Sequence, residues 1–210
     1  MSKLDFETAF SQCPLVAILR GLKPEEAIAI GTVLVDAGFT LIEVPLNSPD
    51  PLSSIRIMQE RFGGRAMIGA GTVLSPDHAE AVAGGGGQFV VSPNVDVPTI
   101  RKTRSLGMES LPGYFTMSEA FAALDAGATA LKLFPADGAP PAMLKAQRAV
   151  MPKGVRVLAV GGITQHNMAE WLAAGADGFG LGSVLYKPGK TADAVAADAR
   201  ALLDAIGRAR

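Results

Sequence analysis

The stretch SEAFAALDAGATALKLFPA, residues 118–136, contains one complete copy of the unit from which the fold can be inferred. Its first ten residues place apolar side chains at helical spacing, and Gly127 suits the end of that helix because glycine readily adopts the left-handed conformation. The apolar run ATALKLF follows and predicts a buried strand that ends before Pro135. Helix, Ala-Gly joint and buried strand therefore follow one another without a long loop.

The same unit recurs along the chain. Helices are also expected over PEEAIAIGTVLVDAG from residue 24 and TQHNMAEWLAAG from residue 164, and Ala-Gly joints recur in DAGF (36–39) and AAGA (173–176). Eight apolar runs predict strands: PLVAILR from 14, TLIEVPL from 40, AMIGA from 66, QFVVS from 88, MESLP from 108, ATALKLF from 128, RVLAV from 156 and DGFGLG from 177. Strands that alternate with helices predict a parallel sheet.

Eight such units in a chain of 210 residues favour a closed (β/α)8 TIM barrel with short loops. An open doubly wound sheet would more naturally carry a GxGxxG nucleotide-binding loop. The residues before the first strand predict an extra N-terminal helix that covers the bottom of the barrel. No second domain or linker is evident, so residues 1–210 are expected to form one α/β domain.

The composition limits the partners of the protein. A formal net charge of −1 without a basic cluster argues against nucleic acid or an anionic membrane as a partner, so a small-molecule substrate is expected. Cys13 is the only cysteine, and no paired Cys/His spacing suggests a metal site. The absence of a signal-peptide pattern and of a long apolar run predicts a cytoplasmic protein.

Lys132 lies in the middle of a predicted buried strand. In TALKLF it shares a face with Ala130 and Phe134, whereas the neighbouring leucines suit the helix layer, so Lys132 is expected to point into the barrel. A buried lysine must be paired, reach solvent or lose its proton. Glu43 is the corresponding charged residue of the second strand, and because alternate strands fill one layer, the two side chains could meet. A purely structural ion pair is the alternative.

Two further polar residues are expected at the same end of the barrel, where active sites of such barrels lie. Arg20 closes the first strand and Thr72 follows the third. Taken singly, Arg20 could form a strand-end salt bridge and Thr72 could cap a turn or helix. Their gathering with Lys132 and Glu43 at one end favours a catalytic site.

The loops after the last two strands are rich in glycine. Gly161 and Gly162 follow the seventh strand, and Gly182 and Ser183 follow the eighth. Backbone N–H groups in these loops form the usual phosphate site of such barrels, so a phosphorylated ligand is expected. Lys187, farther along the last loop, is expected to be an ordinary solvated charge.

The motifs LVAILRG, LIEVPLNSP, IGAGTVL, ALKLFPA, AVGGI and GLGSVLY, in this order along nearly the whole chain, resemble the class I 2-keto-3-deoxy-6-phospho-sugar-acid aldolase family. The resemblance implies that Lys132 forms a Schiff base and that Glu43 shuttles protons, with no metal or other cofactor. It also implies that Arg20 and Thr72 hold the keto-acid end of the substrate, and that the protein assembles as a homotrimer. The phosphate would be bound by Gly161, Gly162, Gly182 and Ser183.

The family has a gluconate and a galactonate branch, whose substrates differ in configuration at C4. The gluconate branch has a strand-two pattern like EVTLRT and a threonine before the strand-seven glycines. Here the pattern is EVPLNSP, with Asn47 in place of that arginine, and Val160 precedes the glycines. These features, with an arginine at position 20, resemble the galactonate branch, which implies cleavage of 2-dehydro-3-deoxy-6-phosphogalactonate to pyruvate and glyceraldehyde 3-phosphate.

Three alternatives remain open from the sequence. The gluconate epimer could be the substrate, alone or alongside the galactonate epimer, because single contacts discriminate modestly. A phospho-sugar isomerase or epimerase could share the barrel and the phosphate loops, but it would not need a covalent lysine. A noncatalytic phospho-ligand sensor would need the anion site but not a buried amine beside a carboxylate.

Overall fold

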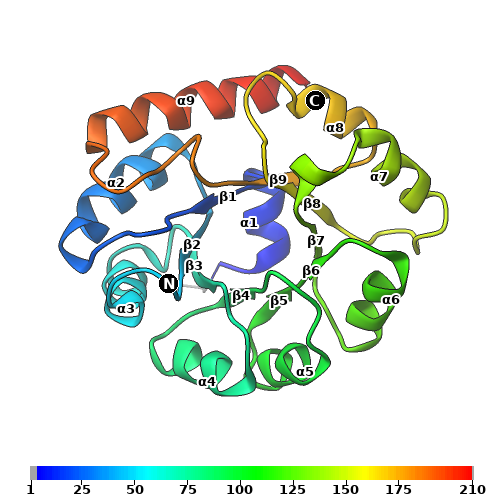
Figure 1. Cartoon of the computed structure of the whole chain (residues 1–210). Coiled ribbons are helices and arrows are strands. Elements are labelled where there is room, and N and C mark those ends of the chain that lie inside the picture. Colours follow the sequence, from blue (N-terminus) through cyan, green and yellow to red (C-terminus); the bar gives the residue numbers. More distant parts are fainter. Residues whose placement is uncertain (1–3, 210) are drawn as a thin grey trace.

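The computed structural model describes residues 4–209, whose strands form one parallel sheet in the order β5-β4-β3-β2-β1-β9-β8-β7-β6. Helices surround the strands as an outer ring (Figure 1). The strands are β1 (Leu15–Ile18), β2 (Leu41–Pro45), β3 (Met67–Gly71), β4 (Phe89–Val91), β5 (Glu109–Leu111), β6 (Gly113–Tyr114), β7 (Leu131–Leu133), β8 (Val157–Val160) and β9 (Gly178–Leu181). Every predicted strand is present.

The predicted fifth strand, residues 108–112, contains β5, and β6 begins directly after Pro112, beyond the predicted run. β5 pairs with β4, and β6 pairs with β7. The Pro112 carbonyl accepts a hydrogen bond from the Lys132 N–H at 3.0 Å, although proline itself donates none. Residues 109–114 therefore connect both ends of the sheet, and the predicted (β/α)8 barrel is confirmed.

The helices begin where the sequence supplies capping residues. The N-caps Ser75, Asp96 and Thr116 each accept a backbone N–H in the first turn of the following helix. The α-helices are α1 (Phe6–Gln12), α2 (Ala27–Ala37), α3 (Pro51–Phe62), α4 (Pro76–Gly84), α5 (Val97–Ser105), α6 (Met117–Asp125), α7 (Pro141–Arg148), α8 (Met168–Ala173) and α9 (Ala192–Ala209), with short 3-10 helices η1 (Pro24–Glu26) and η2 (Ala136–Gly138).

The three Ala-Gly joints end helices as predicted. Gly38, Gly127 and Gly175 follow α2, α6 and α8 with φ of 115°, 97° and 103°. These values lie in the left-handed region, where a residue with a side chain would be strained. The repeated joints therefore turn each helix back into the next strand.

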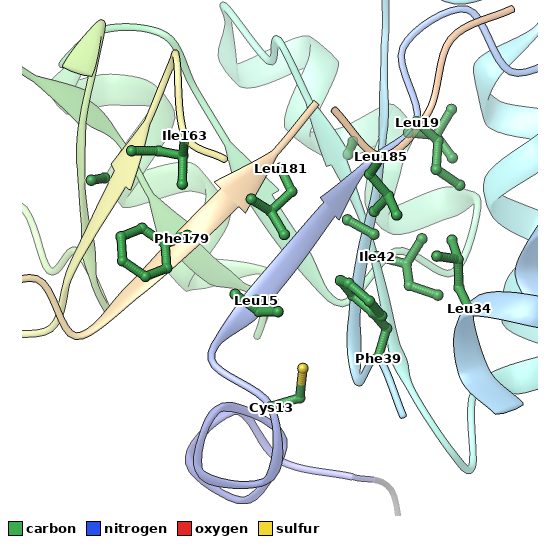
Figure 2. Close-up of a cluster of buried hydrophobic side chains, with 14 of the residues drawn as sticks. Cys13, Leu15, Leu19, Leu34, Phe39, Ile42, Ile163, Phe179, Leu181 and Leu185 are labelled. Carbon is green, nitrogen blue, oxygen red and sulfur yellow. The ribbon is translucent and has the colours of Figure 1, made fainter. Parts of the chain in front are cut away.

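Apolar side chains form two layers, one inside the barrel and one between the strands and the helices. In the outer layer, Figure 2 shows Leu34 of α2 beside Ile42 of β2, with Leu15 of β1 and Phe39 close by. All four are fully buried. Alternate residues of the same strands face inward, which gives each strand one side for each layer.

Helix α1 covers the end of the barrel where the strands begin. Its Phe6 and Phe10 pack in the same cluster as Val16 and Leu41, which point into the barrel. The hydroxyl of Thr40, just before β2, donates a 2.7 Å hydrogen bond to the Ala9 carbonyl. Figure 1 shows α1 at the centre of the ring of strands. The predicted bottom helix is thus confirmed, and the opposite end of the barrel stays accessible.

Candidate active site

Lys132 points into the barrel from the middle of β7. Its strand neighbours Leu131 and Leu133 belong to the outer layer, whereas Ala130 belongs to the interior cluster. The lysine is 8% exposed and lines a small interior cavity of about 10 Å³. This volume is near the minimum that holds one water molecule. The orientation predicted from strand alternation is therefore correct.

Glu43 of β2 lines the same cavity and is 3% exposed. Its carboxylate lies against the backbone of Gly71, where an added Cβ would be 2.5 Å from the Glu43 Oε1. Oε2 has no hydrogen-bond partner within the described chain. A buried carboxylate oxygen without a partner is rare and is typical of sites that act on a ligand or a proton.

Lys132 and Glu43 share the cavity without forming a direct ion pair. The ion pairs found among residues 4–209, with N···O distances up to 4.0 Å, do not include these two side chains. The simple structural reading of a closed buried salt bridge is therefore not what the geometry shows. Both groups instead line one cavity whose volume of about 10 Å³ is near the minimum for one water molecule.

Burial changes the proton affinity of both groups in opposite directions. It raises the pKa of Glu43 to about 7, against the effect of the Lys132 and Arg20 cations. Burial lowers the pKa of Lys132; the Glu43 carboxylate opposes this lowering, and the Arg20 guanidinium adds to it. An amine that loses its proton readily and a carboxyl that titrates near neutrality are suited to nucleophilic attack and to proton transfer, respectively.

A larger cleft of about 730 Å³ opens above the interior cavity at the carboxyl ends of the strands. Val160 lines both spaces and so connects them. The predicted residues that line the cleft are Arg20, Val160, Gly161, Gly162, Gly182 and Ser183. The structure thus brings together all predicted site residues except one, with the titratable pair at the bottom and the glycine loops at the mouth.

The glycine loops expose backbone donors to this cleft. Within residues 4–209, no protein hydrogen bond uses the backbone N–H of Gly162 or of Ser183. Gly162 has a φ of 65°, and a Cβ there would lie 2.8 Å from the Cβ of Asp137 in η2. A side chain at this position is therefore excluded by conformation and by contact. Unused N–H groups of this kind are suited to an anion.

Thr72 is the predicted site residue that lines neither space. It follows β3 directly, at the same end of the barrel, and has a φ of 57°. A left-handed conformation is unusual for a β-branched residue and costs on the order of 1–3 kcal/mol. Such strain is concentrated at functional sites in proteins, which is in keeping with a role for Thr72 beside the cleft.

Three contributions to the site were not predicted from the sequence. The ring of Phe134 lines the cleft and lies 4.4 Å, centroid to Nζ, from Lys132. The exposed Lys187 also lines the cleft, so its interpretation as an ordinary solvated charge missed its position. Gly71 provides the surface against which Glu43 rests. For Phe134 the signal was present, because strand alternation already placed it on the face of Lys132.

Within residues 4–209, no group of three or more His, Cys, Asp or Glu side chains is arranged to hold a metal ion. None of the helices in that part of the chain is both long enough and apolar enough to cross a membrane.

Comparison with known proteins gives consistent results. The family model described as KDPG and KHG aldolase matches residues 6–198. The chain is 45% identical over 199 residues to the 2-dehydro-3-deoxy-6-phosphogalactonate aldolase of Escherichia coli (strain K12), over 95% of this chain and 97% of that protein. It is 49% identical over 192 residues to a probable 2-dehydro-3-deoxy-6-phosphogalactonate aldolase of Rhizobium meliloti (strain 1021), over 91% of each chain.

Among solved structures, one described as native KDPGal superposes with a TM-score of 0.93 and 45% sequence identity. The superposition covers 94% of this chain and 96% of the other.

Proposed function

Because the chain belongs to the KDPG and KHG aldolase family, we propose that it cleaves 2-dehydro-3-deoxy-6-phosphogalactonate to pyruvate and glyceraldehyde 3-phosphate through a Schiff base. The observation that carries the proposal is the buried pair of Lys132 and Glu43 beneath a cleft with unused anion donors. Burial shifts the pKa of each group in the direction that favours the reaction.

Lys132 supplies the nucleophile. Its neutral amine attacks the C2 carbonyl of the substrate, and the resulting carbinolamine takes up a proton and loses water to give a protonated Schiff base. Burial lowers the pKa of this amine and so favours the neutral form that the attack needs. The iminium then withdraws electrons from the bond between C3 and C4, so no other cofactor is needed as an electron sink.

Glu43 supplies proton transfer. Its carboxylate takes the proton of the C4 hydroxyl, directly or through one water, while the C3–C4 electron pair moves into the enamine and C4 becomes the aldehyde carbon. It then returns a proton to C3, and hydrolysis of the pyruvate iminium regenerates the amine of Lys132. A pKa of about 7 lets the carboxyl accept and return a proton near neutral pH.

The two ends of the substrate are held by opposite parts of the cleft. Arg20 influences the pKa of both Lys132 and Glu43, which supports its assignment to the substrate carboxylate next to the reacting carbon. Thr72 would act at the same end. Binding at both ends orients the scissile bond over the lysine.

The glycine loops hold the phosphate in this proposal. The free N–H groups of Gly162 and Ser183 support that assignment, with Gly161 and Gly182 beside them. Lys187 adds a cation at the cleft, and no ion pair within residues 4–209 uses its ammonium group. A phosphate dianion would be bound more strongly by these groups together than by backbone donors alone.

The galactonate epimer is the preferred substrate in this account. The relatives with 45% and 49% identity carry that name, and Val160 lines the passage between Lys132 and the phosphate loops. Because valine cannot form a hydrogen bond with its side chain, the C4 hydroxyl must be recognised by other groups of the cleft. The gluconate epimer, with a threonine at this position in its branch, is the alternative.

Pyruvate release from each epimer tests the function directly. We expect a higher kcat/KM with the galactonate substrate when pyruvate is followed by a coupled lactate dehydrogenase assay. A higher value with the gluconate substrate would transfer the assignment to the other branch. If neither substrate yields pyruvate, the aldolase proposal fails and an isomerase, an epimerase or a phospho-ligand sensor becomes the better reading.

We also propose that the protein is a homotrimer, as the family resemblance implies. Light scattering after size-exclusion chromatography should give the mass of three chains. The mass of one or two chains would contradict this part of the proposal.

A further inference from the structure

The ring of Phe134 faces the nitrogen of Lys132. The distance from Nζ to the ring centroid is 4.4 Å, within the range of about 6 Å over which an aromatic face attracts a cation. Phe134 is partly buried and packs against the interior cluster that lines the barrel. Its N–H donates a hydrogen bond to the Tyr114 carbonyl at 3.1 Å, which fixes the backbone that carries the ring.

We propose that Phe134 is a catalytic residue whose ring face stabilises the positive charge on the Lys132 nitrogen, first in the ammonium and then in the protonated Schiff base. This inference rests on the proposed function. Nζ stays bonded to the same Cε through the reaction, so the iminium charge forms within reach of the same ring. The enamine formed by C3–C4 cleavage is neutral and receives no such stabilisation.

Few other groups can supply this stabilisation. The charged side chains that act on Lys132 are Glu43 from β2, which favours the cation, and Arg20 beyond β1, which disfavours it. The rest of the interior cavity is lined by aliphatic side chains and Gly180. Because Glu43 must become neutral when it accepts a proton, the ring is the one cation partner within the described site that keeps its attraction through the cycle.

The inference predicts a particular dependence on pH. Below the pKa of Lys132 the free enzyme carries an ammonium and the pyruvate adduct carries an iminium, so the ring stabilises both and its effect on pyruvate binding cancels. Above that pKa the free amine is neutral and only the iminium gains. A ring with a less negative face should therefore weaken iminium formation at alkaline pH and leave it unchanged at acidic pH.

Fluorinated phenylalanines at position 134 provide the test, because they reduce the negative face of the ring with little change of shape. The readout is the pyruvate concentration that gives half-maximal borohydride trapping, measured at pH values on both sides of the Lys132 pKa with mono-, di- and trifluorophenylalanine. We expect this concentration to rise stepwise with fluorination, by about 3- to 30-fold in total at the alkaline end. At the acidic end it should stay constant.

A second variant separates charge stabilisation from packing. Phe134→Leu removes the aromatic face but keeps an apolar side chain, so it should behave like the most fluorinated ring. If the ring only excluded water, the fluorinated series would be flat and Phe134→Leu alone would raise the pKa of Lys132 by admitting solvent. A flat series in an enzyme that traps pyruvate overturns this inference, whereas absence of trapping in the wild type overturns the proposed function instead.

Discussion

Replacement of Gly71 by alanine tests the placement of the proton-transfer group without changing its chemistry. The added Cβ would lie 2.5 Å from the Glu43 Oε1 and 2.9 Å from its Cδ. Ordinary contact requires about 3.5 Å, so the carboxylate must move by about 1 Å. Gly71 is not among the residues with positive φ, so alanine is compatible with its backbone conformation. The effect should therefore come from the contact alone.

A displacement of about 1 Å in a catalytic group can reduce turnover by about 100-fold. We expect this loss in kcat for Gly71→Ala with the galactonate substrate, measured as pyruvate release. Lys132 extends from β7, on another side of the barrel, so pyruvate should still be trapped on it by borohydride. The extra methyl group in the interior should cost about 1–3 kcal/mol of unfolding free energy, which leaves the protein folded at 25 °C.

Gly207→Ala is the matched control, because an added Cβ in α9 meets no atom within 4 Å. It should change neither turnover nor trapping. Near-normal turnover in Gly71→Ala would show that the position of Glu43 does not limit the reaction. A parallel loss of trapping would show that the substitution disturbs Lys132 or the fold, and the reasoning about Glu43 would then lose its support.

Of four other predictions, two concern the charge of Glu43, one the anion end of the cleft and one the choice of epimer. Because burial raises the pKa of Glu43 to about 7, kcat/KM should rise as the pH increases through about 7. Glu43→Gln should abolish this rise. An unchanged pH profile in the variant would show that another group causes the rise. In the unfolded chain Glu43 ionises near its usual pKa of 4.5, whereas in the folded protein it keeps its proton up to a pH of about 7. The unfolded state therefore loses this proton first, and the free energy of unfolding falls as the pH rises from 4.5 to about 7. Glu43→Gln should therefore match the wild type in urea unfolding at pH 4 and exceed it by up to about 3 kcal/mol at pH 8; equal curves at both pH values would contradict the shift. Gly162→Ala and Lys187→Met should each raise KM for the phosphorylated substrate by about 10-fold or more without changing pyruvate trapping. A loss of trapping would show that these residues do not act only on the phosphate. Val160→Thr should shift the ratio of kcat/KM values toward the gluconate epimer by about 10- to 100-fold, and an unchanged ratio would remove this residue from specificity.

The arrangement of the barrel was largely predictable because it depends on local patterns. Left-handed glycines such as Gly38 and Gly127 mark the helix ends, and the alternation of TALKLF fixes the direction of Lys132. These signals depend on neighbours in sequence. The predicted fifth strand ended at Pro112, and the sequence did not indicate that strand pairing resumes after it, because pairing on both sides of a proline depends on partners far along the chain.

The details of the site depend on distances across the barrel, and these were not predictable. Sequence phase placed Lys132 and Glu43 in one layer, but only the fold shows that they share a cavity without a direct ion pair. The support of Glu43 by Gly71 likewise joins two strands at a contact that no spacing encodes. Thr72 appeared as a polar strand-end residue, and its left-handed backbone was invisible in the sequence.

The central claim is that Lys132 becomes covalently attached to the keto acid. The most direct measurement is mass spectrometry of the intact protein after incubation with pyruvate and borohydride, followed by peptide mapping, in parallel with Lys132→Ala. We expect a single adduct on Lys132 and none in the variant. An adduct that persists in Lys132→Ala, or a folded wild type that forms none, would contradict the claim and leave Lys132 as a buried structural cation.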